Sequence, residues 1–146
     1  MKIEKGEVSP LDLEIARLLV SIEDKYPSLQ DVYFHKTVEA DSVLAILVRR
    51  GDIPKMLSYG GKIIKFLEKK VKKSIRLLEY EADERKFLED LFAPFSVLTV
   101  NKIWLPDGTT ETKVILKKKR FQLNTEAVKE IAKKVHGITL RIEFAG

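Results

Sequence analysis

Apolar residues recur every three or four positions across residues 11–22, which predicts an amphipathic helix near the start of the chain. Ser9 and Pro10 stand immediately before this run, where an N-cap and a first-turn proline are favourable. Pro27 restricts the residue that precedes it, so we expect the helix to end at or before Tyr26. Regular structure therefore begins with one helix whose apolar face covers a core.

Two runs typical of strands follow this helix, at residues 31–38 and 42–50. The second is apolar without a break over residues 43–48, so we expect a strand that is buried on most of its surface. Residues 39–41, Glu-Ala-Asp, are predicted to form the hairpin turn between them. A closing strand is predicted at residues 74–80, and together these runs indicate a small sheet.

Residues 51–61 separate the second strand from a basic helix. Gly51 leaves the strand, Pro54 falls in the first turn of a short helix, and a Gly-Gly pair follows. The apolar stripe of the basic helix consists of Ile63, Ile64, Leu67 and Val71. Its other side carries the lysines Lys62, Lys65, Lys69 and Lys72. Such a row is typical of a solvated helix face, and this alternative stays open beside a role in binding.

The second half of the chain repeats the order strand, strand, helix, strand, without a glycine turn before the helix. An acidic helix precedes it at residues 83–92, and we interpret this helix as a connector between two modules. A Pro-Asp-Gly sequence predicts a tight hairpin, because Pro fixes φ, Asp bonds back to the backbone and Gly takes the left-handed conformation. The predicted elements are strands at 95–105 and 110–116, a helix from 124 or 125 to 136, and a last strand at 138–144.

Composition narrows the class of protein. With 146 residues, 45% of them hydrophobic, the chain has room for one ordinary domain or two very small ones with packed cores. It contains no cysteine, which excludes disulfides and thiolate metal sites and fits a cytoplasmic protein. There is no run of about 18 apolar residues and no signal-peptide core at the N-terminus, so we expect no membrane partner.

Positive charge is concentrated around the glycine turn. The net charge of the chain is +5, but residues 49–76 contain ten Lys and Arg against two acidic residues, a local +8. Residues 77–93 carry a local −4. A Gly-Gly turn at a helix start exposes backbone N–H groups at the positive end of the helix dipole, which favours a phosphate. We therefore expect a polyanionic ligand at this turn, with nearby lysines adding charge.

The stretch Gly-Asp-Ile-Pro-Lys-Met-Leu-Ser-Tyr-Gly-Gly at 51–61 resembles the G-D-x-x-K-x-I-G-x-G-G segment of the archaeal NusA-like transcription factors, which are tandem KH-domain proteins. The resemblance continues at 67–70, 75–80 and 87–94, and it covers nearly the whole chain in element order. It implies an α+β protein of two tandem type II KH modules, each a small three-stranded sheet covered by helices. It also implies RNA binding linked to transcription termination or elongation.

The first module departs from the family at its loop. KH domains carry a G-x-x-G loop, and the matching residues here are Ser58, Tyr59, Gly60 and Gly61. Serine in the first position is tolerated unless φ must be positive, so we expect binding that is weakened rather than abolished. Tyr59 either stacks on a base, a contact worth roughly 1–3 kcal/mol, or packs on its own module. Both interpretations stay open.

The second module departs further. The family places a short helix and a full G-x-x-G loop after the second strand, but here few residues lie between 116 and 124 and none is glycine. We therefore expect a degenerate KH module without a phosphate clamp. Four consecutive cations, Lys117, Lys118, Lys119 and Arg120, either make secondary phosphate contacts or form a solvated edge.

Catalysis has little support in the sequence. His35 falls in a predicted strand and His136 at a helix end, with no spacing typical of a metal site. The chain has no Walker loop, no G-x-S-x-G elbow and no nucleophilic cysteine. We expect no catalytic residue, no metal and no cofactor.

These observations predict a single-stranded RNA-binding, NusA-like protein of transcription termination or elongation. The expected domains are residues 1–81, an acidic connector at 82–94 and the degenerate module at 95–146. The expected RNA contacts are Lys55, Ser58, Tyr59, Gly60, Gly61, Lys62, Lys65 and Lys69. One alternative is a degenerate KH adaptor that docks through protein contacts on RNA polymerase, a ribosome or an RNA-processing complex. Another is a Gly-Gly corner with no ligand.

Overall fold

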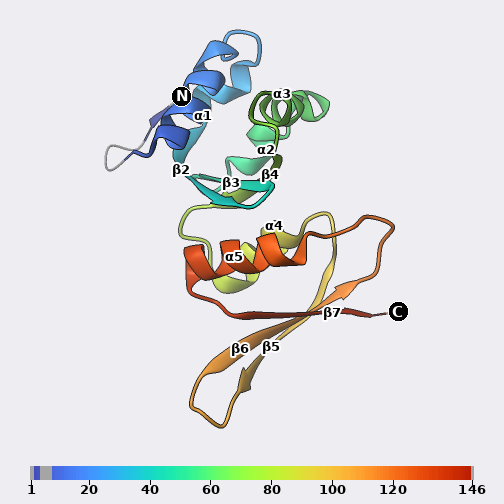
Figure 1. Ribbon diagram of the computed structural model, residues 1–146. Coiled ribbons are helices and arrows are strands. Elements are labelled where there is room, and N and C mark those ends of the chain that lie inside the picture. The colour runs from blue at the N-terminus through green and yellow to red at the C-terminus, as the bar shows by residue number, and fades with distance from the viewer. Residues whose placement is uncertain (1, 4–7, 146) are drawn as a thin grey trace. The chain divides into compact units, whose positions relative to one another are not determined.

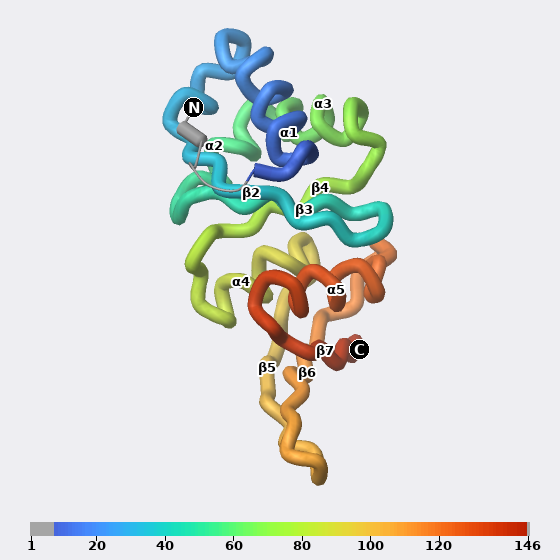
Figure 2. Tube along the Cα trace, turned by 60° about the vertical axis from the view of Figure 1, so that its left-hand side comes forward, coloured from blue at the N-terminus to red at the C-terminus, as the bar shows by residue number. Residues whose placement is uncertain are grey.

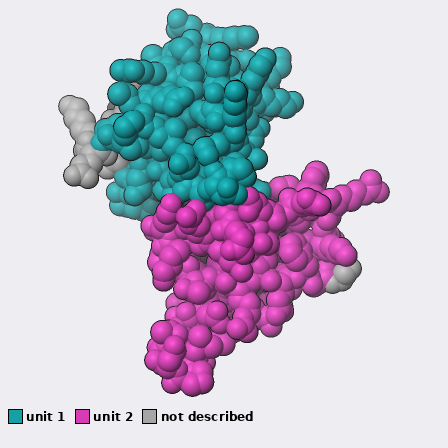
Figure 3. Space-filling view, viewed as in Figure 1, with its two compact units in different colours: residues 1–82 teal, residues 83–146 magenta. Residues whose placement is uncertain are grey.

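The computed structural model describes residues 2–3 and 8–145, and the chain divides into two compact units, residues 1–82 and 83–146 (Figure 3). Most of the N-terminal stretch considered for a signal peptide, residues 1 and 4–7, lies outside the described residues. The first unit contains a four-stranded sheet in the order β1-β2-β3-β4. The second contains a three-stranded sheet in the order β5-β6-β7. Helices accompany both sheets, so the protein is a two-module α+β fold.

The elements of the first unit are β1 (Lys2–Ile3), α1 (Pro10–Ser21), the 3-10 turn η1 (Pro27–Asp31), β2 (Tyr33–Ala40), β3 (Val43–Val48), α2 (Ile53–Met56), the 3-10 turn η2 (Tyr59–Gly61), α3 (Lys62–Val71) and β4 (Ser74–Glu79). Those of the second unit are α4 (Glu84–Phe92), β5 (Val97–Trp104), β6 (Thr110–Lys117), α5 (Thr125–His136) and β7 (Leu140–Ala145).

Both units follow the same strand topology. β2 is antiparallel to β3, and β4 lies parallel on the other side of β3. β5 is antiparallel to β6, and β7 lies parallel on the other side of β6. The helix between the second and third of these strands, α3 or α5, makes the crossover (Figure 1). The predicted repeat of strand, strand, helix, strand is therefore confirmed.

α1 begins where the sequence predicts. The Ser9 hydroxyl accepts a hydrogen bond from the Asp12 amide at 3.0 Å, and the Asp12 carboxylate accepts one from the Ser9 amide at 3.0 Å. This reciprocal pair is a capping box, which satisfies two N–H groups that a helix start leaves unpaired. The helix ends at Ser21, before Tyr26 as predicted.

The core of the first unit lies between the sheet and its helices. α1 and α3 cover the same face of this sheet (Figure 2). All six residues of β3 are buried, as its unbroken apolar run predicts. Leu44 and Ile46 of β3 join Ile63 and Leu67 of α3 in one cluster of buried side chains. The apolar stripe of the basic helix therefore faces the core, which leaves its lysine side outward.

The first hairpin turns later than predicted. β2 starts at Tyr33 because residues 27–31 form the 3-10 turn η1, and it continues to Ala40, which pairs with Val43. Asp41 takes the left-handed conformation with φ 53°, which aspartate tolerates better than most residues. The last strand likewise begins two residues after the predicted position 138, at Leu140.

α4 is integrated into the second unit. Its N-cap, Asp83, accepts a hydrogen bond from the Lys86 amide at 2.8 Å. Phe87 of α4 stacks on the ring of His136 at the end of α5, with ring centroids 4.3 Å apart. The helix that we interpreted as a separate connector thus packs as the first helix of this unit. In the described part of the chain, no helix is both long and apolar enough to cross a bilayer.

Candidate nucleic-acid interface

The segment between β3 and α3 is held in place by a buried carboxylate. Asp52 is fully buried, and its Oδ2 accepts a hydrogen bond from the Tyr33 amide at 2.7 Å. Its Oδ1 lies 3.2 Å from Arg49 Nη2 and 3.2 Å from Lys55 Nζ. These contacts fasten the start of α2 to the start of β2. Asp52 is not among the residues predicted for the site. The sequence signal for its role is an acidic residue in the segment 49–76, which contains ten Lys and Arg.

A second acidic residue holds the same corner from the other side. The Gly51 amide donates to Glu79 Oε2 at 3.0 Å, and Glu79, the last residue of β4, is only 7% exposed. The exit of β3 is thereby connected to both neighbouring strands. Sequence reasoning missed Glu79, because its partner Gly51 is 28 residues away along the chain.

The turn itself has an unusual backbone. Tyr59, Gly60 and Gly61 all have positive φ, at 62°, 66° and 78°. A Cβ atom on either glycine would meet nothing within 4 Å, so glycine is favoured here by backbone conformation and not by crowding. Ser58 has φ −59°, and its hydroxyl donates to the Pro54 carbonyl at 3.0 Å. The first loop position therefore does not need glycine, which was the condition for serine to be tolerated.

Backbone donors are accessible at this turn. The Gly61 amide bonds to the Ser58 carbonyl at 3.3 Å. Among the described residues, no acceptor pairs with the amides of Tyr59 and Gly60, and both of these residues are exposed. Free amides beside the positive end of α3 are the groups with which a protein backbone binds an anion.

Tyr59 packs on its own unit. Its ring lies 5.0 Å from the ring of Tyr26, tilted by 54°. Its hydroxyl accepts a hydrogen bond from the Ser28 amide at 3.2 Å. Of the two interpretations that the sequence leaves open, packing is the one the structure shows. The side chain contacts η1 through its ring and its hydroxyl, while Tyr59 stays 41% exposed.

The predicted lysines fall into two groups. Lys62, Lys65 and Lys69 are exposed on α3 and form no ion pair with any residue that the structure describes. Their spacing places them on one side of the helix that begins at the turn. Lys55 instead contacts Asp52, and its ammonium also donates to the Asp31 carbonyl at 3.3 Å. Lys55 thus shares the Asp52 carboxylate with Arg49, and its side chain remains 37% exposed.

In the second unit, residues 118–124 form a loop that contains no helix. The four predicted cations of the second unit are all exposed: Lys117 at the end of β6, and Lys118, Lys119 and Arg120 in this loop. They lie in a different compact unit from the glycine turn.

Each of the two histidines stacks on an aromatic ring. The His35 ring stacks on Tyr80 with centroids 3.9 Å apart, and burial, followed by the charge of Lys36, lowers the pKa of His35. His136 is stacked on Phe87. Across residues 2–3 and 8–145, no group of three or more His, Cys, Asp and Glu is placed to hold a metal ion.

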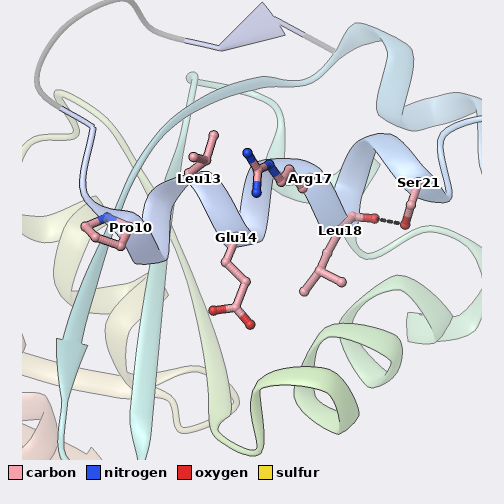
Figure 4. A pocket seen from close by; sticks show the side chains of 6 residues that line it. All are labelled: Pro10, Leu13, Glu14, Arg17, Leu18 and Ser21. Atoms are coloured by element: carbon pink, nitrogen blue, oxygen red, sulfur yellow. Dashed lines mark hydrogen bonds between the residues drawn. The ribbon is translucent and has the colours of Figure 1, made fainter.

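A groove of about 380 Å³ runs along α1, away from the predicted contacts. Figure 4 shows Glu14 and Leu18 extending from one side of α1 and Leu13 from the other. None of the residues predicted to bind RNA lines this groove, whose walls are Pro10, Leu13, Glu14, Arg17, Leu18 and Ser21.

Two archaeal proteins are similar to part of the chain, and each is named as a probable transcription termination protein NusA. The one from Methanocaldococcus jannaschii is 32% identical over 65 residues, which are 44% of this chain and 34% of the relative. The one from Methanococcus vannielii is 31% identical over 65 residues, 44% of this chain and 36% of the relative. The match spans about a third of the length of these curated relatives.

The fold itself has a counterpart among solved structures. The crystal structure of APE1850 matches with a TM-score of 0.60 at 17% identity, over 94% of this chain and 100% of that chain. At this identity the match concerns the fold alone. No protein-family model matches the chain. The comparisons therefore support a NusA-like relationship over part of the chain, within a two-module α+β fold.

Proposed function

We propose that the chain is a NusA-like protein that binds single-stranded RNA and acts in transcription termination or elongation. The observation that carries this proposal is the turn at residues 59–61. There the exposed Tyr59 and Gly60 have amides that no described residue pairs, and lysines without a described ion pair follow directly on α3. The partial similarity to two proteins named as NusA supports it. Under this proposal the first unit, residues 1–82, is a type II KH module and the second, residues 83–146, a degenerate one.

The structure suggests different roles for the proposed contacts. The amides of Tyr59 and Gly60 bind a phosphate, and Lys62, Lys65 and Lys69 neutralise the phosphates that follow along α3. KH domains hold about four nucleotides in this way. Lys55, Ser58 and the Tyr59 ring each contact their own unit, and under this proposal they also support the turn. The role is binding, with no catalytic step and no cofactor.

Replacing both turn glycines by aspartate tests the proposal. Aspartate tolerates positive φ better than most residues, and no atom blocks a side chain at either position, so the fold is expected to remain. The two new carboxylates repel a phosphate. In a fluorescence titration with a short single-stranded RNA, the Kd of Gly60→Asp/Gly61→Asp should rise at least about tenfold, which is ~1.4 kcal/mol.

The matched control is Gly108→Asp/Gly137→Asp. These glycines also have positive φ, 87° and 66°, and open space around the Cβ position, so the control changes charge and backbone strain alike. It should bind RNA like the wild type. Equal Kd values for the two double variants would contradict the proposal, as would a wild-type protein that binds no RNA.

One observation favours an adaptor as the second candidate function. Trp104 is 75% exposed and Leu98 is 46% exposed, both on β5 of the unit that lacks a glycine turn. Exposed tryptophan is typical of residues that anchor protein interfaces. A wild-type chain that does not bind RNA would favour docking on RNA polymerase or another RNA-processing complex through this strand.

A further inference from the structure

The loop that joins β6 to α5 occupies the place in the second unit that the glycine turn occupies in the first. β6 is the central strand of its sheet, as β3 is, with an antiparallel neighbour on one side and a parallel one on the other. α5 is the crossover helix, as α3 is. Residues 118–124 therefore lead from a central strand to the start of a crossover helix (Figure 1, orange loop on the right).

Charge and exposure distinguish this loop from an ordinary connection. The four cations at 117–120 are exposed and form no ion pair with the described residues. No acidic residue lies between 117 and 124. The first acidic side chain beyond it, Glu126, is 3.9 Å from Lys129 Nζ. No described carboxylate therefore neutralises the positive charge of residues 117–120, which can attract an anionic ligand.

An aromatic ring stands at the end of the basic run. Phe121 is 62% exposed, whereas the phenylalanines of α4, Phe87 and Phe92, are fully buried. A solvated basic edge accounts for the cations, but it gives no reason for an exposed phenyl ring beside them. An aromatic ring among cations is the combination with which proteins bind single-stranded nucleic acid, because the ring stacks on a base and the cations meet the phosphates.

The two ends of the loop are fixed to the second unit. The Lys118 amide donates to the Ala145 carbonyl of β7 at 3.3 Å. Asn124 accepts a hydrogen bond from the Ala127 amide at 3.1 Å and so caps α5. The cations and Phe121 are therefore presented between two anchored points. This lowers the entropic cost of binding relative to a free tail.

We propose that residues 117–121 form a second contact for single-stranded nucleic acid, in which Phe121 stacks on a base and Lys117, Lys118, Lys119 and Arg120 meet phosphates. This contact rests on the proposed RNA-binding function only for the identity of the ligand. In this second contact an aromatic ring stacks on a base, whereas in the proposed contact of the first unit backbone amides bind a phosphate.

Alanine substitution of Phe121 in the full chain tests the contact. With a fluorescein-labelled 12-nucleotide RNA, Phe121→Ala should raise Kd by about fivefold or more, the lower end of what base stacking contributes. Phe121→Tyr should retain binding because it keeps an aromatic face. The matched control is Trp104→Ala, which removes another exposed ring of the same unit, and it should leave Kd unchanged. Equal losses in Phe121→Ala and Trp104→Ala would overturn the proposal.

Heparin separates stacking from charge, because it is a polyanion without bases. Phe121→Ala should bind heparin as well as the wild type does, while Lys118→Ala/Lys119→Ala should bind both ligands less tightly. If Phe121→Ala weakens heparin and RNA binding alike, the ring supports the loop and does not stack on a base, and the proposal fails.

A fluorescence reporter gives a direct reading of the ring. Trp104 is the only tryptophan, so Trp104→Phe/Phe121→Trp places the only indole in the loop. Single-stranded RNA should quench its emission, and unchanged emission at saturating RNA would overturn the proposal.

The two functional claims fail separately. If Gly60→Asp/Gly61→Asp loses binding but Phe121→Ala does not, the glycine turn stands and the loop contact falls. If Phe121→Ala loses binding but Gly60→Asp/Gly61→Asp does not, the loop contact stands and the proposed phosphate contact at the glycine turn is contradicted.

Discussion

At the scale of single residues, Asp52 is the support of the candidate interface. It is fully buried, and Asp52→Ala would leave the Tyr33 amide without its acceptor. Arg49 and Lys55 are 49% and 37% exposed, so their charges can return to water. We therefore expect a loss of about 1.5–3 kcal/mol in the free energy of unfolding, the range for hydrogen bonds to a charged group. Urea denaturation measures it.

Asp24→Ala is the control for this change. Asp24 is exposed and its side chain makes no hydrogen bond or ion pair with the described residues, so its removal should alter the free energy of unfolding by less than about 0.5 kcal/mol. A similar loss in both variants would show that Asp52 acts through general charge and not through its specific hydrogen bonds. RNA binding by Asp52→Ala, measured where the protein is folded, should weaken because the turn loses its support.

At the scale of elements, Asp12 joins α1 to the sheet. Besides its part in the capping box, its Oδ1 accepts hydrogen bonds from the amide and the hydroxyl of Thr37 on β2. Burial on its own would raise the pKa of Asp12, but the hydrogen bonds from Thr37 and Ser9 outweigh it and lower the pKa below 3.8. The ionised carboxylate is thus the form that the folded state prefers.

This preference makes the docking of α1 sensitive to acid. Because the folded pKa is lowered, the stabilisation is fully present above about pH 4 and is lost as the pH falls through the folded value. Asp12→Asn cannot accept at every contact, and we expect it to lose about 1–2 kcal/mol in the free energy of unfolding at pH 7. Urea unfolding should show the difference from the wild type shrinking towards about pH 2.

Glu14→Gln on the same helix is the control, since Glu14 is exposed and has no partner among the described residues. It should unfold with nearly the wild-type free energy at pH 7. A difference between Asp12→Asn and the wild type that does not change with pH would contradict a role for the ionised carboxylate.

The elements were more predictable than the contacts that join them. Periodicity located the helices and strands, because burial of one face is a local property of the sequence. It did not find the Asp12–Thr37 bridge, whose partners are 25 residues apart and carry no local signal. The same holds for Glu79 and Gly51, which are 28 apart. The sequence leaves the packing of Tyr59 open for the same reason, because its partner Tyr26 is far from it along the chain.

At the scale of the whole molecule, one strand topology occurs twice with different chemistry in the same loop. The first unit has a glycine turn with two amides that no described residue pairs, and the second has a basic loop with an exposed ring. The order of the elements was predictable because hydrophobic periods repeat along the chain. The absence of a helix in the second loop followed from its length. Which cations pair within the described part of the chain depends on three-dimensional neighbours, as the contact between Lys55 and Asp52 illustrates.

The distribution of paired and unpaired lysines predicts how binding depends on salt. Each phosphate contact to single-stranded nucleic acid lowers the slope of log K against log salt concentration by about 0.7. Lys62, Lys65 and Lys69 form no ion pair with the residues that the structure describes, so their replacement by glutamine should make the slope less negative by about 2. RNA titrations at three or more salt concentrations measure this change.

A second triple variant separates specific contacts from net charge. Lys86, Lys113 and Lys134 lie 2.8, 3.2 and 3.7 Å from Asp90, Glu143 and Glu130, so each already neutralises a carboxylate. Their replacement by glutamine removes the same three charges from the chain and should leave the slope nearly unchanged. If both variants flatten the slope equally, RNA responds to the overall charge of the protein. A flatter slope in the first variant alone would mean that the lysines following the glycine turn contact the phosphates themselves.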